Sequence, residues 1–104
     1  MQKFLITRTI PGVGAFTPEQ IRAVAKESCR VLRELGTQIQ WMESYVTQDT
    51  MTCVYLATDA ALIFEHARRG GFPADRVESI SYIVDSTTAD GSVWHAGATQ
   101  PAAA

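Results

Sequence analysis

The order of elements in this 104-residue chain predicts an α+β fold of the ferredoxin-like βαββαβ type. Two observations lead to this prediction. Segments with helical spacing alternate with short runs rich in β-branched and aromatic residues, and glycine and proline mark the boundaries. We expect a four-stranded antiparallel sheet with both helices on one face. The length predicts one domain, over residues 1–90, followed by a loose C-terminal tail over residues 91–104.

The first half of the pattern is a strand followed by a helix. Residues 2–9 are short and mainly apolar or β-branched, which is typical of a strand. Thr17 then caps a helix, Pro18 suits its first turn, and Gln20 completes a capping box. Gly36 ends this helix, which we expect to cover one face of the sheet.

The second half consists of a hairpin, a helix and a last strand. Alternating residues predict strands over 38–46 and 51–57, with the turn at 48–50. Asp59 opens the second helix, and Gly70 and Gly71 end it. The two arginines in the last turn interact favourably with the helix dipole. Residues 77–84 form the predicted fourth strand. The inward-facing side of the second helix is predicted to comprise Ala60, Ile63, Phe64 and Ala67.

Composition excludes several classes of function. A net charge of −2 gives no electrostatic basis for binding nucleic acid or anionic lipid. No apolar run approaches the roughly 18 residues of a membrane helix, and the chain starts directly with a strand-like segment instead of a signal peptide. Two cysteines are too few for a disulfide framework. We therefore expect a cytoplasmic protein with reduced thiols.

The hairpin is unusual because both of its faces carry large side chains. An ordinary half-buried hairpin has one apolar and one solvated face. We expect Tyr45 opposite Cys53 and Glu43 opposite Tyr55, on the face that the helices leave bare. Such a face would be an association hazard, which indicates a homodimer whose two sheets enclose a cleft. The predicted helix-facing set is Met42, Val46, Val54 and Leu56, and the predicted bare-face set is Trp41, Glu43, Tyr45, Cys53 and Tyr55.

Several segments together carry a family resemblance. They are the RT at the end of the first strand with the Pro-Gly that follows, and then QWMESYVT, TCVYLA, EHARRGGFPADRV and VDSTTAD. Over about residues 2–90, the chain resembles a family of small bacterial proteins associated with nickel binding, formerly a domain of unknown function. The resemblance implies a dimeric, ferredoxin-like fold of the α+β-barrel type. It implies nickel as the metal, but no ligand can be matched to a position in this chain.

Glu43 and Cys53 are the main candidate metal ligands. A carboxylate and a thiolate on one face could bind nickel or another divalent transition metal, since sulfur suits nickel, zinc or copper better than magnesium. Alternatively, Cys53 is a small buried hydrophobe and Glu43 pairs with an arginine. His66 could bind metal separately with Glu65 or Asp59, because its helix lies on the other side of the sheet; the alternative is a boundary histidine.

Arg8, Trp41, Tyr45 and Tyr55 are the candidate ligand-binding residues. Arg8 could anchor an anion or neutralise a carboxylate, or it could be a solvated strand-end cation. The three aromatic side chains could line a pocket or fill a dimer interface. No nucleophile–base–acid group is visible, which disfavours a triad hydrolase.

Three functions remain open from the sequence. The first is a homodimeric nickel-binding protein without enzymatic activity. The second is a small-molecule-binding protein or cofactor-independent enzyme that uses the dimer cleft, with Glu43 or Tyr45 moving protons. The third is an interaction domain with a filled interface.

Overall fold

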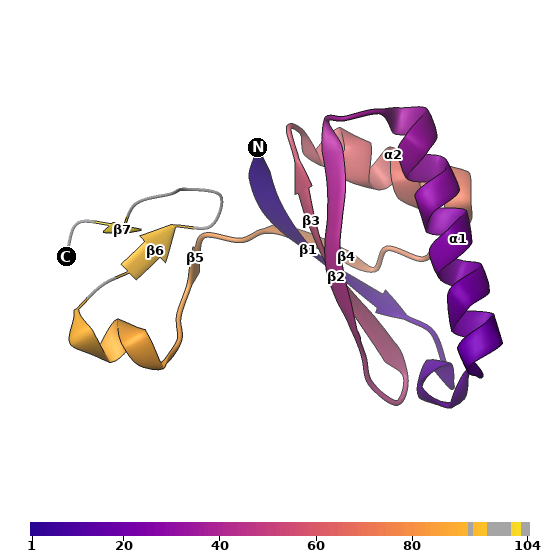
Figure 1. Ribbon diagram of the computed structural model, residues 1–104, viewed down its shortest axis with the longest axis horizontal. Coiled ribbons are helices and arrows are strands. Elements are labelled where there is room, and N and C mark those ends of the chain that lie inside the picture. The colour runs from indigo at the N-terminus through magenta and orange to yellow at the C-terminus, as the bar shows by residue number, and fades with distance from the viewer. Residues whose placement is uncertain (92, 96–100, 103–104) are drawn as a thin grey trace.

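The computed structural model describes residues 1–91, 93–95 and 101–102. Its main body confirms the βαββαβ order and the α+β fold. Four antiparallel strands are arranged in the order β2-β3-β1-β4, and both helices pack on one face of this sheet (Figure 1). No helix in the described part is long and apolar enough to cross a membrane. The elements of the main body are β1 (Gln2–Thr9), a 3-10 turn η1 (Val13–Ala15), α1 (Pro18–Leu35), β2 (Ile39–Val46), β3 (Thr50–Ala57), α2 (Ala60–Gly70) and β4 (Arg76–Ser79).

The fourth strand is shorter than predicted. Strand β4 ends at Ser79, which pairs with Phe4 near the start of β1, and the Ile80 amide still donates to the Lys3 carbonyl at 2.8 Å. Beyond this point β1 has almost no residues left to pair with, so the chain leaves the sheet.

Described residues after β4 form a second, small sheet in which β6 lies between the other two strands. Figure 1 shows this sheet apart from the main one, on the side away from the helices. Of the predicted loose tail over residues 91–104, residues 92, 96–100 and 103–104 lie outside the described residues, while residues 93–95 and 101–102 form strands. The elements of this region are β5 (Tyr82–Ile83), a 3-10 turn η2 (Ser86–Asp90), β6 (Val93–His95) and β7 (Pro101–Ala102).

Both helices begin as the sequence predicts, but the buried face of α2 differs. In α1 the capping box between Thr17 and Gln20 is present in both directions. In α2 the Asp59 side chain accepts from the Ala61 amide at 2.8 Å. Phe64, predicted to face inward, is 54% exposed. The helix instead buries Ile63, His66 and Ala67, which share one face at i, i+3 and i+4 spacing.

Strand β3 turns the opposite face toward the helices from the one predicted. Met51, Cys53, Tyr55 and Ala57 are all buried, and the residues between them are partly exposed. The prediction placed the aliphatic Val54 and Leu56 under the helices because that set looked more like a core. The prediction was wrong because the polar atoms of Cys53 and Tyr55 find partners beneath the helices. These two residues can therefore be buried there in place of aliphatic ones.

A β-bulge in β2 explains the second error in the predicted faces. The register shifts between Trp41 and Glu43, so Met42 is the extra residue. A bulge of one residue reverses the alternation that follows it. Trp41 and Ser44 therefore pair with Tyr55 and Cys53, which leaves Glu43 and Tyr45 on the helix-free face. The predicted pairs of Tyr45 with Cys53 and of Glu43 with Tyr55 do not form.

Candidate ligand-binding site

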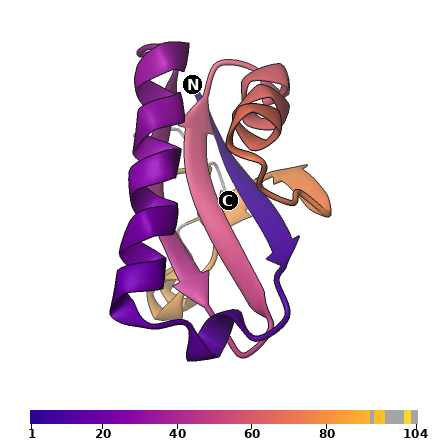
Figure 2. The ribbon, with the colours of Figure 1, turned by 90° about the vertical axis from the view of Figure 1, so that its right-hand side faces the viewer.

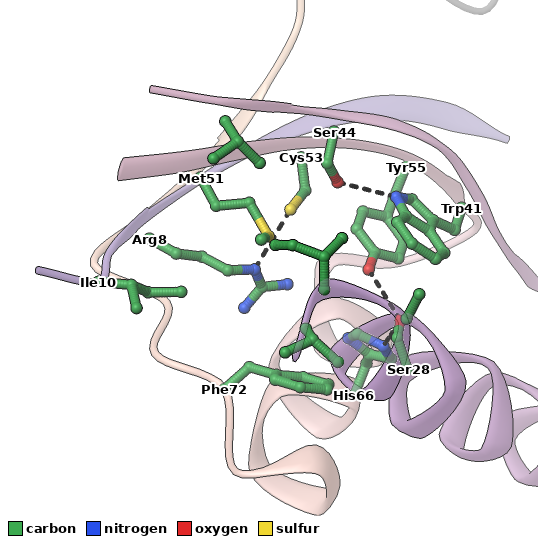
Figure 3. A pocket seen from close by; sticks show the side chains of 14 residues that line it. Arg8, Ile10, Ser28, Trp41, Ser44, Met51, Cys53, Tyr55, His66 and Phe72 are labelled. Carbon is green, nitrogen blue, oxygen red and sulfur yellow. Dashed lines mark hydrogen bonds between the residues drawn. The ribbon is translucent and has the colours of Figure 1, made fainter. Parts of the chain in front are cut away.

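A half-enclosed cavity of about 180 Å³ lies between the sheet and the helices. Side chains from β1, β2, β3, α1 and α2 line it, together with Phe72 from the loop after α2. The walls are largely apolar, and the polar groups of Arg8, Ser28, Tyr55 and His66 meet at the cavity (Figure 3). Figure 2 shows the face on which α1 and α2 lie over the strands.

The end of α2 places Phe72 at the wall of the cavity. Gly71 adopts a left-handed conformation with φ 70°, which turns the chain back, and the Phe72 amide donates to the Ala67 carbonyl at 2.9 Å. A side chain on Gly70 would overlap the Phe72 ring. The two glycines therefore let the ring fold against His66, with the ring centroids 5.3 Å apart.

Arg8 is a buried cation inside this cavity. It is 3% exposed, and its Nε donates to Cys53 Sγ at 3.4 Å while its Nη1 donates to the Pro73 carbonyl at 2.6 Å. Its guanidinium carbon lies 5.6 Å from the centre of the Phe72 ring, within the range of a cation–π contact. The third nitrogen, Nη2, is buried and has no hydrogen-bond partner. Among the described residues, no carboxylate lies within ion-pair distance of Arg8.

His66 is held at the same cavity by a chain of hydroxyl groups. Its Nε2 lies 3.0 Å from Ser28 Oγ, which lies 3.4 Å from Tyr55 Oη. Its other nitrogen, Nδ1, is buried without a partner. Burial lowers the pKa of His66 to about 4, and the positive charge of Arg8 acts in the same direction. The imidazole is therefore neutral at neutral pH.

Tyr55 and Trp41 form a second aromatic part of the wall, besides Phe72. Their rings stack with centroids 6.4 Å apart, and the Trp41 indole donates to Ser44 Oγ at 2.9 Å. Burial raises the pKa of Tyr55, so its hydroxyl keeps its proton at neutral pH. No Asp or Glu is among the described residues that line the cavity, so Arg8 gives it a positive character.

Three of the four candidate ligand-binding residues meet at this cavity. Arg8, Trp41 and Tyr55 line it, although they do so beneath the helices and not in the predicted dimer cleft. Tyr45 lies on the opposite face, 57% exposed, and its hydroxyl donates to Glu43.

The candidate metal ligands are divided between the two faces of the sheet. Cys53 and His66 line the same cavity, so the expectation that the sheet separates them is wrong. Glu43 is exposed on the other face. Across the described residues, no group of three or more His, Cys, Asp or Glu side chains is placed to hold a metal ion. Within one chain, the described Glu43, Cys53 and His66 therefore cannot all bind the same nickel ion.

Sequence reasoning missed the contact between Ser28 and His66. The two residues are 38 positions apart and come from different helices, and neither helix alone indicates the pairing. Two local signals pointed toward it: Ser28 interrupts the apolar face of α1, and His66 lies three residues after Ile63 on α2. Phe72 had a clearer signal, because it directly follows the paired glycines that end α2.

Comparison with known proteins gives a family and a fold. No curated protein matches the chain. Among solved structures, the chain is similar to the one titled "Crystal structure analysis of SCO4226 from Streptomyces coelicolor A3(2)", with a TM-score of 0.66 and 15% identity over 79% of this chain and 99% of that one. The family profile described as "Nickel responsive protein SCO4226-like" matches residues 4–80, which span the main body from β1 to β4. The chain therefore belongs to the SCO4226-like family.

Proposed function

We propose that this protein binds a small molecule in the cavity between its sheet and its helices. The observation that carries the proposal is the buried Arg8, whose charge has no counter-ion among the described residues and whose Nη2 has no hydrogen-bond partner. Buried charges are normally paired, because removing an ion from water costs several kcal/mol or more. A bound ligand that supplies the missing partner accounts for this arrangement.

The size and lining of the cavity support the same proposal. Its volume of about 180 Å³ exceeds the roughly 150 Å³ of an engineered cavity that binds benzene. Apolar walls with a few converging polar groups are typical of small-molecule sites. Ala25 on α1 is one of the lining residues, whereas the neighbouring Ala23 is exposed and does not line the cavity. This pair allows a matched test.

A thermal-shift screen tests the proposal. Wild-type protein is melted with a panel of compact aromatic compounds, both neutral and acidic, and the screen is repeated on Ala25→Phe and Ala23→Phe. Because ligands that bind the folded state raise its melting temperature, we expect stabilisation of wild type and Ala23→Phe but not of Ala25→Phe. Absence of any stabilised sample, or equal stabilisation of Ala25→Phe, would contradict the proposal.

Nickel binding is the second candidate, and the family description favours it. In this chain Cys53 and His66 are the two candidate ligands that share a cavity, with Glu43 excluded by the sheet. We propose that nickel or another divalent transition metal binds either to Cys53 and His66 or between two copies of the chain. Sulfur and imidazole both suit nickel.

Calorimetric titration of metal-stripped, untagged protein with Ni²⁺ tests the second candidate. Loss of affinity in Cys53→Ser and His66→Gln, but not in Glu43→Ala, would place the metal in the cavity. Loss only in Glu43→Ala would place it on the helix-free face. No binding by the wild type would remove nickel as a direct ligand.

We also propose that the protein is a cytoplasmic homodimer that joins through the helix-free face. Leu5, Val54 and Leu56 are partly exposed there, beside the exposed Tyr45, which supports an association surface. We expect sedimentation analysis to show a wild-type dimer, a monomer for Leu56→Glu and a dimer for Phe64→Glu on the exposed side of α2. A monomeric wild type would contradict this proposal.

A further inference from the structure

We infer that the ligand of the cavity is a monocarboxylate with a compact apolar or aromatic body. The inference rests on the proposed function, because it specifies the chemistry of the molecule that the cavity holds. It is carried by the two buried polar atoms without partners, Arg8 Nη2 and His66 Nδ1, and by the apolar character of the remaining wall.

Arg8 supplies the charge for an anionic group. Two of its nitrogens are already engaged by Cys53 and Pro73, so the guanidinium is fixed in place with one nitrogen left to donate. The side chain is 3% exposed, which leaves water little access to that nitrogen. A carboxylate oxygen that accepts from Nη2 forms a charge-assisted hydrogen bond, which is stronger than one between neutral groups.

His66 supplies the second contact. The Arg8 guanidinium and the His66 ring border the same space, and both pack against Phe72 (Figure 3). When a carboxylate is bound, the tautomer with hydrogen on Nδ1 is favoured, because Nδ1–H then donates to the second carboxylate oxygen. Nε2 in turn accepts the hydroxyl hydrogen of Ser28, and Ser28 Oγ accepts that of Tyr55. Arg8 Nη2 and His66 Nδ1, the two buried atoms that lacked a partner, then each have one.

The charge and the wall together disfavour a phosphate dianion and a bare inorganic ion as the ligand. Arg8 is the one Lys or Arg among the described lining residues, so the site compensates one negative charge and not the two of a phosphate dianion. Ile21, Met51 and Phe72 are among the apolar residues of the wall, which an inorganic ion would leave uncovered. An organic acid with a ring or a short branched body satisfies both conditions.

Isothermal titration calorimetry with three probes tests this inference. Benzoate carries the acid and the ring, benzyl alcohol carries the ring without the charge, and inorganic phosphate carries the charge without the ring. We expect wild-type protein to bind benzoate about tenfold or more tightly than benzyl alcohol, and phosphate more weakly than benzoate. Arg8→Gln should bind benzoate no more tightly than benzyl alcohol. Arg76→Gln, which removes an exposed arginine paired with Glu78, should leave the ratio of wild type unchanged.

The outcomes separate the inference from the function on which it rests. Equal affinity of wild type for benzoate and benzyl alcohol, or tighter binding of phosphate, would overturn the monocarboxylate and leave a small-molecule site in place. Failure of both aromatic probes to bind wild-type protein would overturn the proposed function itself. The comparison of probes on the wild type does not depend on whether Arg8→Gln folds.

Discussion

Lowering the pH should destabilise this protein through His66, in a range where few other groups titrate. Burial and the nearby Arg8 lower the pKa of His66 in the folded state to about 4, from an ordinary value of 6.5. Between these two values the unfolded chain binds a proton at this residue and the folded chain does not. Stability from the neutral imidazole is therefore fully present above about pH 6.5 and is lost as the pH falls toward about 4.

The size of the effect follows from the shift. In the window between the two pKa values, each pH unit costs about 1.4 kcal/mol of unfolding free energy. From about pH 7 to about pH 4.5 we expect a loss of about 2 kcal/mol from His66 alone. The carboxyl groups with lowered pKa values, those of Glu27, Glu65 and Asp85, begin to contribute only near and below their ordinary values of 4.5 and 3.8.

Urea unfolding at fixed protein concentration, followed by circular dichroism in half-unit steps of pH, measures this loss. All proteins in this experiment also carry His95→Gln, which leaves His66 as the one histidine of the sequence. In that background, His66→Gln can still reach Ser28 but does not titrate, and its unfolding free energy should stay nearly constant over the same window. An equal decline in His66→Gln would refute the assignment of the pH dependence to His66.

Three further predictions concern local structure. Thr17→Ala should lower the unfolding free energy by about 1 kcal/mol in urea unfolding, because it removes the capping box of α1; an unchanged midpoint would contradict this. Gly71→Ala should cost about 1 kcal/mol by the same measurement, since φ is 70° there, and a neutral result would show that the turn relaxes. A polymer-linked thiol reagent, too large to enter the cavity, should modify the exposed Cys29 rapidly and the buried Cys53 only on unfolding, with mass spectrometry as the readout; rapid labelling of Cys53 would contradict its burial.

Most of the fold could be predicted from the sequence because its signals are local. The bounds of β1, the capping box at Thr17 and the glycines that end both helices each depend on neighbouring residues. The length of β4 could not be predicted in this way. It depends on where its partner β1 begins, and that is a property of the pairing and not of the segment itself.

The site was harder to predict because its side chains come together from different elements. Alternation along β2 and β3 grouped Trp41 with Tyr55 correctly, but the bulge at Met42 is invisible in a pattern of period two. The buried face was also misjudged, because aliphatic residues were preferred over a cysteine and a tyrosine that have polar partners. Arg8 could be named as a candidate anion site from its type and its place near a strand end, beside the alternative of a solvated cation, whereas its burial came only with the packed structure.

The central claim is that the cavity beneath the helices receives the ligand. Two-dimensional ¹H–¹⁵N NMR of the wild-type protein, titrated with benzoate, tests it most directly. We expect the backbone amides of Ser28 and His66 and the indole of Trp41 to shift together and to saturate at one affinity. Shifts confined to Glu43 and Tyr45 on the helix-free face, or no saturable shifts at all, would contradict the claim.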